Sequence, residues 1–500
     1  MNVRIPDQFI IYASNFTLES IIISFANIAF DIYKNPDDKF GSFAGYREYS
    51  VKVSNRVIHD KVLIVQTWMI DLIYELSLIT PKGKKYIDKN ETLYLIHLYN
   101  NYANKKDGVR FNDKSYSNTD FHLHLYGFFG EQKRFEEQYK FLEEFSREKY
   151  ILEIVSSKPK MKEKFGISFV DEFLSITGYT TDMYSAMLFM IFGYVSQFSP
   201  IIYADRIDEC FGLIDFDLGK ILNLLERYSC SIDELSTSVF KRQLLYQKPF
   251  IKYKNIFISA NPFLVISLFI NSNYLIIREK YKNSDNDNQR FINAFGKYFE
   301  EYFEELLENC LPQGTFVRIE ECDKKRADWH IKLNNYDILV EQKSGLSILD
   351  IKQNEPNLVS MKQHIVKNWG KAVKQLDETE KFLELKNAIK IILVYEDYYK
   401  SESFELLFEI DPDLNPLNNR KFWLLTINEF EMFLDLYKKD SHLFFEIIKE
   451  KDDLETSLSV EGRDMEAIMK KHKINKNEYL SDYGINAQFD RIVKLIKSKD

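Results

Sequence analysis

The chain has 500 residues, of which 45% are hydrophobic and 29% charged, a composition typical of a globular protein with roughly two to four domains. Its formal net charge of -9 argues against a surface coated with basic residues for nucleic acid, although an enzyme that cuts DNA needs only a local basic rim. None of the 4 cysteines lies in a CxxC pair, which argues against a zinc ribbon or a disulfide framework.

Residues 1–280 have the composition and periodicity of helices. Glycine and proline are scarce in the chain, at 17 and 11 residues. Residues 61–79 are apolar on all sides and predict an interior helix, and residues 91–102 and 135–155 predict two more. We therefore predict a large, mainly α-helical domain over residues 1–280.

The most apolar stretch of the chain is Ala186–Ala204. Ser196, Gln197, Ser199 and Pro200 interrupt it, whereas a membrane span needs roughly 20 predominantly apolar residues. A buried core helix is therefore predicted here. The first residues show no basic segment followed by a long apolar core, so we expect no secretory signal, no membrane partner and a cytoplasmic location.

A polar segment rich in Asn and Asp, Tyr281–Arg290, predicts a linker and the main domain boundary. A second domain is expected over residues 281–440, and a charged helical tail over residues 441–500. The elements predicted in the second domain are a helix at 291–310, strands at 315–322, 327–333 and 336–343, a helix at 359–385, a strand at 388–397, and a strand followed by a helix at 421–439 with Thr426 or Asn428 as its cap.

The second and third of these strands are separated by Asn334 and Asn335. Asparagine tolerates the positive φ that two-residue hairpin turns demand, so this pair predicts a tight turn. Leu333 then pairs with Tyr336, and the register of the whole hairpin follows from that pair.

Three charged residues converge in this register. Asp328 lies directly opposite Glu341, where Cβ atoms are about 4.5–5.5 Å apart. Lys343 is two residues beyond Glu341 and points to the same face of the strand. The spacing therefore predicts two carboxylates and one ammonium group on one patch.

Adjacent carboxylates repel each other unless a positive charge sits between them. Mg²⁺ suits such a position, because one or two carboxylates together with waters and substrate phosphate commonly hold it, and Mn²⁺ is expected to substitute. The ion would polarise a phosphate oxygen and lower the pKa of a bound water. Lys343 could then orient that water or stabilise the charge that develops on phosphorus. These are the groups that hydrolysis of a phosphodiester needs.

The pattern resembles the PD-(D/E)XK nuclease superfamily, which has the restriction-endonuclease-like fold. Asp328 stands at a strand start, and Glu341, Gln342 and Lys343 form the (Asp/Glu)-x-Lys element on the next strand. Ala327 replaces the proline of the family motif. The resemblance covers about residues 291–435 and implies an α/β (α+β) nuclease domain with a mixed sheet flanked by helices, preceded by the mainly helical domain.

Two further positions follow from the resemblance. Many members carry a glutamate on the helix before the sheet, and Glu300 occupies that place, with Glu301 and Glu304 as rivals. Many also carry a glutamine on the helix after the motif strand, which Gln375 supplies. The resemblance thus implies catalytic roles for Asp328, Glu341, Lys343 and Gln375, and metal-binding roles for Glu300, Asp328 and Glu341. Lys371, one turn before Gln375, could face phosphate but is better explained as a solvated lysine.

An ordinary cross-strand ion pair between Lys343 and Asp328 or Glu341 is the competing interpretation, and such pairs are common. The combination of a helix with Glu300, the hairpin register, alternating strands and a following helix with Gln375 favours the nuclease. Lys324, Lys325 and Arg326 directly precede the carboxylates and could form a local phosphate-binding rim, or simply a solvated turn.

We therefore expect a metal-dependent nuclease, with DNA as its expected nucleic-acid substrate and endonucleolytic cleavage as its reaction. Residues 1–280 would recognise the substrate, form a homo-oligomer, bind a partner protein or suppress the activity. This layout resembles stand-alone nucleases of bacterial restriction and antiviral defence systems. The alternative is a module that binds nucleic acid or a partner protein through a nuclease-like fold without cutting.

Overall fold

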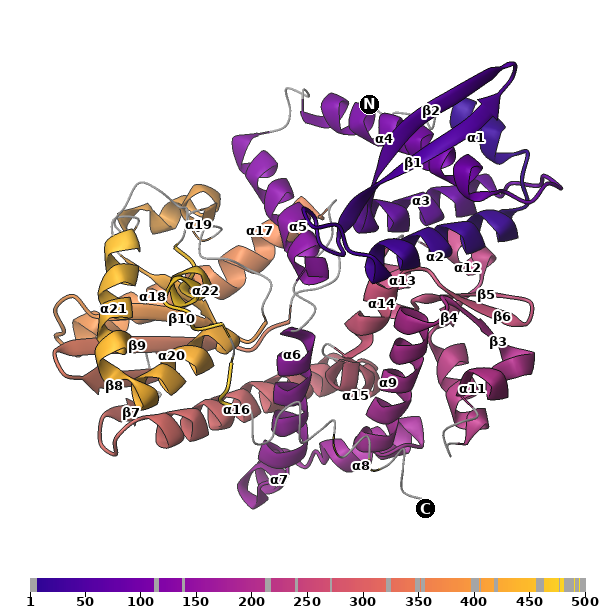
Figure 1. The fold of residues 1–500 in the computed structure, drawn as a ribbon. Coiled ribbons are helices and arrows are strands. Elements are labelled where there is room, and N and C mark those ends of the chain that lie inside the picture. The colour runs from indigo at the N-terminus through magenta and orange to yellow at the C-terminus, as the bar shows by residue number, and fades with distance from the viewer. Residues whose placement is uncertain are drawn as a thin grey trace.

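A computed structural model describes residues 7–111, 117–136, 140–211, 217–238, 242–269, 272–320, 325–346, 351, 356–396, 404, 406–417, 421–455, 463–475, 477–480, 490 and 494. The fold is mixed α/β, with helices flanking small sheets (Figure 1). Within these ranges, no helix is both long and apolar enough to cross a membrane.

Helices predominate before residue 282, as predicted, but small sheets accompany them. The helices are α1 Asp7–Ala13, α2 Leu18–Lys34, α3 Gln66–Ile79, α4 Lys89–Phe111, α5 Asn118–Glu136, α6 Lys140–Lys149, α7 Pro159–Phe165, α8 Phe169–Thr177, α9 Thr181–Gln197, α10 Ile207–Phe211, α11 Leu218–Arg227, α12 Ile232–Thr237, α13 Arg242–Gln247, α14 Pro262–Ile266 and α15 Ser272–Tyr281. The strands are β1 Ala44–Val53, β2 Arg56–Val65, β3 Ile201–Tyr203, β4 Ser229–Cys230, β5 Phe250–Tyr253 and β6 Ile256–Ser259. Strands β1 and β2 form a separate hairpin that projects from the body (Figure 1).

Two predictions in this region need correction. The helix predicted over residues 61–79 is a strand up to Val65 and a helix only from Gln66. The run before Val65 is short and rich in β-branched residues, so periodicity alone could not separate strand from helix. Antiparallel pairing with β1 makes it a strand. The apolar stretch at residues 186–204 is a helix through Gln197, as predicted, but ends in the short strand β3.

The predicted linker at residues 281–290 is also wrong for most of its length. Tyr281 ends α15, and Ser284 caps the next helix by accepting a hydrogen bond from the Asp287 backbone N–H at 3.1 Å. Asp285 lies in the first helical turn, where a negative charge is favourable. The polar residues are therefore a helix start rather than a flexible connection.

The second half of the chain contains the predicted order of elements. These are α16 Asp285–Cys310, β7 Phe316–Arg318, β8 Trp329–Leu333, β9 Tyr336–Lys343, α17 Leu358–Ile365, a π-helical turn Val366–Gly370, α18 Lys371–Phe382, β10 Ile389–Val394, α19 Leu406–Ile410, β11 Trp423–Thr426, α20 Ile427–Lys439, α21 Ser441–Glu455 and α22 Met465–Lys471. Thr426, rather than Asn428, caps α20 through a capping box with Glu429.

Strands β7–β11 form one mixed five-stranded sheet in the order β11-β10-β9-β8-β7. Strand β10 is parallel to both β9 and β11, while β7, β8 and β9 are antiparallel neighbours. Leu339 of β9 belongs to a hydrophobic cluster with α17 and α18, whereas Ile338 and Val340 belong to the larger cluster that includes α16 and α20. Alternate β9 side chains thus reach helices on opposite faces of the sheet.

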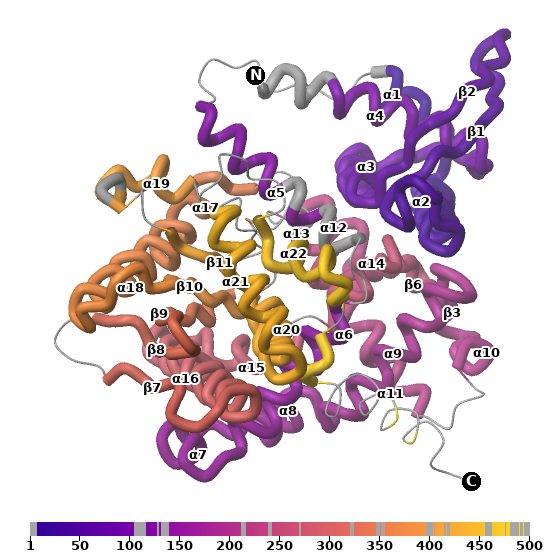
Figure 2. Tube along the Cα trace, turned by 60° about the vertical axis from the view of Figure 1, so that its left-hand side comes forward, coloured from indigo at the N-terminus to yellow at the C-terminus, as the bar shows by residue number. Residues whose placement is uncertain are grey.

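Contacts also join residues on the two sides of the predicted boundary. The larger hydrophobic cluster contains residues from both sides of that boundary, with Phe9 as its first member in the sequence and Leu480 as its last. Arg147 of α6 donates to Glu431 of α20 through Nε at 2.6 Å and Nη2 at 2.7 Å, and Tyr302 of α16 donates to the same carboxylate at 2.5 Å. Figure 2 shows α6 behind α20. The helical part and the sheet are therefore packed as one core.

Candidate active site

The β8–β9 hairpin has the predicted register. Asn334 adopts a φ of 50°, and Leu333 pairs with Tyr336. Just beyond the ladder, the Asp328 backbone N–H donates to the Val340 carbonyl at 3.0 Å. The predicted turn and the predicted strand pairing are both confirmed, and they bring Asp328 to the side of Glu341.

Asp328 is held at the end of the strand pair. Its Oδ2 accepts a hydrogen bond from the Gln342 backbone N–H at 2.7 Å. Burial raises the pKa of Asp328, while that hydrogen bond and the charges of Lys343, Lys297 and Arg318 oppose the increase. The carboxyl group is therefore fixed in place and surrounded by cations, but poorly solvated.

Glu341 is more deeply buried than Asp328, and its pKa is strongly raised. Its side chain is 3% exposed, and burial followed by the charge of Asp328 raises its pKa to about 8, against the lowering effect of Lys343. Oε1 contacts the Lys343 ammonium group, but the buried Oε2 has no hydrogen-bond partner. A buried acceptor without a partner is costly, so this atom marks a place where a ligand would be stabilising.

Helix α18 supplies a fourth group to the site. Lys343 Nζ donates to Gln375 Oε1 at 3.3 Å, and Gln375 Nε2 donates to the Arg326 carbonyl at 2.9 Å. Gln375 thus connects the lysine to the segment that enters β8. The structure brings together all the residues predicted to be catalytic, which are Asp328, Glu341, Lys343 and Gln375.

Gln342 fixes helix α16 against the opposite face of the hairpin. Its Oε1 accepts from Trp329 Nε1 at 2.7 Å, and its Nε2 donates to the Phe299 carbonyl at 3.4 Å. Gly296 lies next to Ser344, since a Cβ atom on this glycine would be 3.3 Å from Ser344 Oγ. The absence of a side chain at Gly296 lets α16 approach the residue that follows Lys343.

The carboxylate of Glu300 in α16 forms ion pairs with two cationic side chains. Lys297 Nζ lies 2.8 Å from its carboxylate, and Arg318 of β7 contacts the other oxygen. The rival Glu301 is bound by Lys158 at 2.6 Å. No three His, Cys, Asp or Glu side chains of the described residues lie close enough together to hold a metal ion. Glu300 is thus not brought into one metal-binding group with Asp328 and Glu341.

The predicted basic rim is only partly described. Lys324 lies outside the described residues, and Lys325 is exposed. The guanidinium of Arg326 stacks on the ring of Phe382 in α18. Lys371 is exposed on α18, which agrees with a solvated lysine.

A small pocket that the sequence did not predict lies beside Lys343. His364, Asn368 and Trp369 line one part of it, and Glu396 lines another. Glu396 follows β10, the strand that lies parallel to the motif strand. The signal available in the sequence was its position as the first acidic residue after that buried strand, because polar residues at the ends of neighbouring parallel strands gather at one sheet edge.

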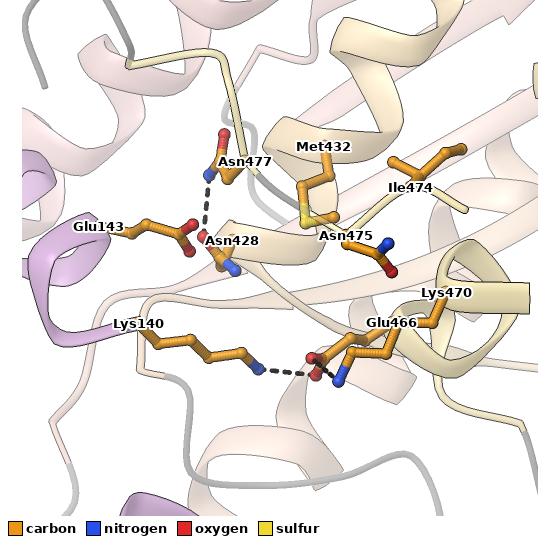
Figure 3. A pocket seen from close by; sticks show the side chains of 9 residues that line it. All are labelled: Lys140, Glu143, Asn428, Met432, Glu466, Lys470, Ile474, Asn475 and Asn477. Atoms are coloured by element: carbon orange, nitrogen blue, oxygen red, sulfur yellow. Dashed lines mark hydrogen bonds and ion pairs between the residues drawn. The ribbon is translucent and has the colours of Figure 1, made fainter. Parts of the chain in front are cut away.

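A second polar pocket lies between α6, α20 and α22 and the residues after α22 (Figure 3). Lys140 of α6 lies 2.7 Å from Glu466 of α22, and Asn477 donates to Asn428 of α20 at 2.8 Å. Burial raises the pKa of Glu143, which also lines this pocket, to about 7. These contacts join the helical part to the C-terminal helices, and Lys343 is not among the residues that line this pocket.

Comparisons with protein-family models, with curated proteins and with solved structures gave no match for this chain.

Proposed function

We propose that the chain is a metal-dependent nuclease that hydrolyses phosphodiester bonds, with DNA as its substrate and endonucleolytic cleavage as its reaction. The observation that carries this proposal is the convergence of Asp328, Glu341, Lys343 and Gln375 at the end of one hairpin. A solvated ion pair would explain Lys343 and Glu341 alone. It would not explain a 3% exposed carboxylate beside a second, partly buried carboxylate.

Asp328 and Glu341 fit a divalent cation. The charge of Asp328 opposes ionisation of Glu341, and Glu341 Oε2 is buried without a hydrogen-bond partner. Mg²⁺, or Mn²⁺ in its place, is commonly bound by one or two carboxylates with waters and substrate phosphate, so a third acidic ligand is not required. When bound, the ion would polarise a phosphate oxygen and lower the pKa of a coordinated water.

The remaining groups of the site act on the phosphate. The Lys343 ammonium group would stabilise the negative charge that develops on the phosphate oxygens during attack. Gln375 holds this ammonium group at 3.3 Å and is itself held by the Arg326 carbonyl, so it is a positioning residue. Lys297 and Arg318 add positive charge near Asp328 and would attract the polyanionic strand.

We expect purified protein to cleave plasmid, single-stranded DNA or RNA in the presence of Mg²⁺ or Mn²⁺ and to lose that activity in EDTA. The measurement is product formation on gels for each substrate with each ion. Cleavage of DNA but not RNA would support the substrate class proposed here, whereas cleavage that persists in EDTA would contradict metal dependence.

A second candidate function is binding of nucleic acid or a partner protein without cleavage. The observation that favours it is the occupation of Glu300 by Lys297 and Arg318, together with the direct ion pair between Lys343 and Glu341. In this case the acidic groups would serve only the fold. Metal binding distinguishes the two functions.

Glu341→Gln is expected to change stability in opposite directions with and without metal. The pKa of Glu341 is about 8 in the fold against an ordinary value of 4.5, so stability is lost as the pH rises between these values. In EDTA at pH 8 or above, the glutamine variant should therefore unfold at a higher temperature than wild type. Adding Mg²⁺ at 100 times its Kd should stabilise wild type by about 2.7 kcal/mol and the variant far less. Equal stabilisation of both proteins in thermal unfolding would place the ion elsewhere.

A further inference from the structure

One face of helix α18 holds the segment that leads into β8. Gln375 Nε2 donates to the Arg326 carbonyl at 2.9 Å. One turn later, the hydroxyl of the buried Thr379 accepts from the Ala327 backbone N–H at 2.8 Å. Phe382 follows on the same face, since residues three or four positions apart are neighbours on a helix. These α18 side chains fix the backbone at Arg326 from successive turns.

The same segment is tied by hydrogen bonds to the candidate active site. Gln375 uses its other side-chain atom, Oε1, to accept from Lys343 Nζ at 3.3 Å. Asp328 comes two residues after Arg326, and its Oδ2 accepts from the Gln342 backbone N–H at 2.7 Å. The backbone of Arg326 is therefore separated from the Lys343 ammonium group by one amide side chain.

The guanidinium group of Arg326 rests on an aromatic ring instead of a carboxylate. Its Cζ lies 3.1 Å from the centre of the Phe382 ring, and Phe382 is itself 54% exposed. Within the described part of the chain, no acidic side chain or carbonyl oxygen accepts a hydrogen bond from this guanidinium. Arg147 and Arg318, in contrast, each pair with a glutamate. The N–H donors of Arg326 are therefore available to a ligand.

We propose that Arg326, supported by Phe382, binds a phosphate of the DNA strand next to the position of cleavage, a role that deepens the proposed function and rests on its nucleic-acid substrate. A guanidinium presents five N–H donors in a plane that matches the geometry of phosphate. Stacking on a ring holds that plane without neutralising its charge.

The charge of the whole chain makes such a cation necessary. The formal net charge is -9, so a polyanionic strand is repelled by much of the molecule. A fixed cation without a carboxylate partner, two residues from Asp328, supplies local attraction at the site. Arg326 would thereby hold the strand in place while Lys343 acts on the phosphate that is cleaved.

The test measures binding apart from cleavage, with a labelled DNA duplex in EDTA over a range of salt concentrations. Arg326→Ala should raise the Kd by about 10-fold, as expected for one charged hydrogen-bonding contact. The slope of log affinity against log salt should fall by about 0.9, because one phosphate contact is lost. The control Arg56→Ala removes an exposed arginine from the β1–β2 hairpin that projects from the body (Figure 1) and should match wild type.

Two further variants separate the charge of Arg326 from its support. Arg326→Lys keeps the charge but not the planar group, and Phe382→Leu keeps the arginine but removes the ring. Both should retain the salt slope of wild type while the Kd rises by roughly 2–5-fold, the contribution of one cation–π contact.

The outcomes separate this role from the proposed function. Wild-type affinity and salt slope in Arg326→Ala would overturn the role, and would leave the nuclease intact if Lys343→Ala still abolished cleavage. Weaker binding by Arg326→Ala with an unchanged salt slope would also overturn it, since Arg326 would then serve only the fold. No DNA binding by wild type at any salt concentration would overturn it as well. Binding that depends on Arg326, in a wild type that cleaves no nucleic acid with Mg²⁺ or Mn²⁺, would support the role and remove the nuclease.

Discussion

Lys343→Ala is expected to lower single-turnover DNA cleavage by about 10²–10³-fold or more, because one charged group that stabilises the transition state commonly contributes that much. The ammonium group is held between Glu341 and Gln375, so it cannot be replaced by a neighbouring cation without rearrangement. The rate is measured with enzyme in excess over a labelled substrate of the kind that wild type cuts.

Lys371→Ala is the matched control for this variant. Lys371 is also a lysine near the site but is exposed on α18, and its substitution should leave the rate close to that of wild type. Thermal unfolding of both variants would show that the fold is retained. A Lys343→Ala protein that cleaves at the wild-type rate would contradict the role of the lysine.

Arg147→Ala is expected to destabilise the protein by about 3–5 kcal/mol, because removal of one partner leaves the charge of Glu431 buried without compensation. Arg147 is 2% exposed and Glu431 is fully buried. Both Nε and Nη2 of the arginine donate to this carboxylate, and Nη2 also donates to Asn428 at 2.9 Å. Urea-induced unfolding monitored by circular dichroism would measure the loss.

Lys252→Ala is the control that removes a solvent-exposed ion pair instead of a buried one. Its ion pair with Glu226 is exposed on both sides, so its loss should cost about 0–1 kcal/mol. The double variant Arg147→Met, Glu431→Leu should be more stable than Arg147→Ala, since it leaves no unpaired charge. Equal losses for Arg147→Ala and Lys252→Ala would contradict the importance of the buried network.

The candidate site was predictable from sequence because its geometry is local. Asn334 fixes the turn, and the period of two along β8 and β9 then determines which side chains face each other. Leu339 and Val340 confirm the alternation by packing on opposite faces. Placement of Gln375 depended on a family resemblance rather than on spacing.

Features that depend on long-range contacts were not predictable. Arg147 and Glu431 meet although they are 284 positions apart, and no local pattern indicates that pairing. The position of Glu396 in the pocket beside Lys343 depends on the parallel pairing of β10 with β9, two strands far apart in the sequence. The errors at residues 61–65 and 281–290 have other causes. Strand and helix signals overlap in the short segment 61–65, and pairing with β1 decides between them. At residues 281–290, the polar residues that suggested a linker include the cap and first turn of α16.

The most direct test of the central claim is a cleavage assay on wild type beside Asp328→Ala, Glu341→Ala and Lys343→Ala, each confirmed as folded. Every reaction would contain the same DNA with Mg²⁺, Mn²⁺ or EDTA. We expect metal-dependent products from wild type and none from the three variants. Undiminished cleavage by all three variants would contradict it.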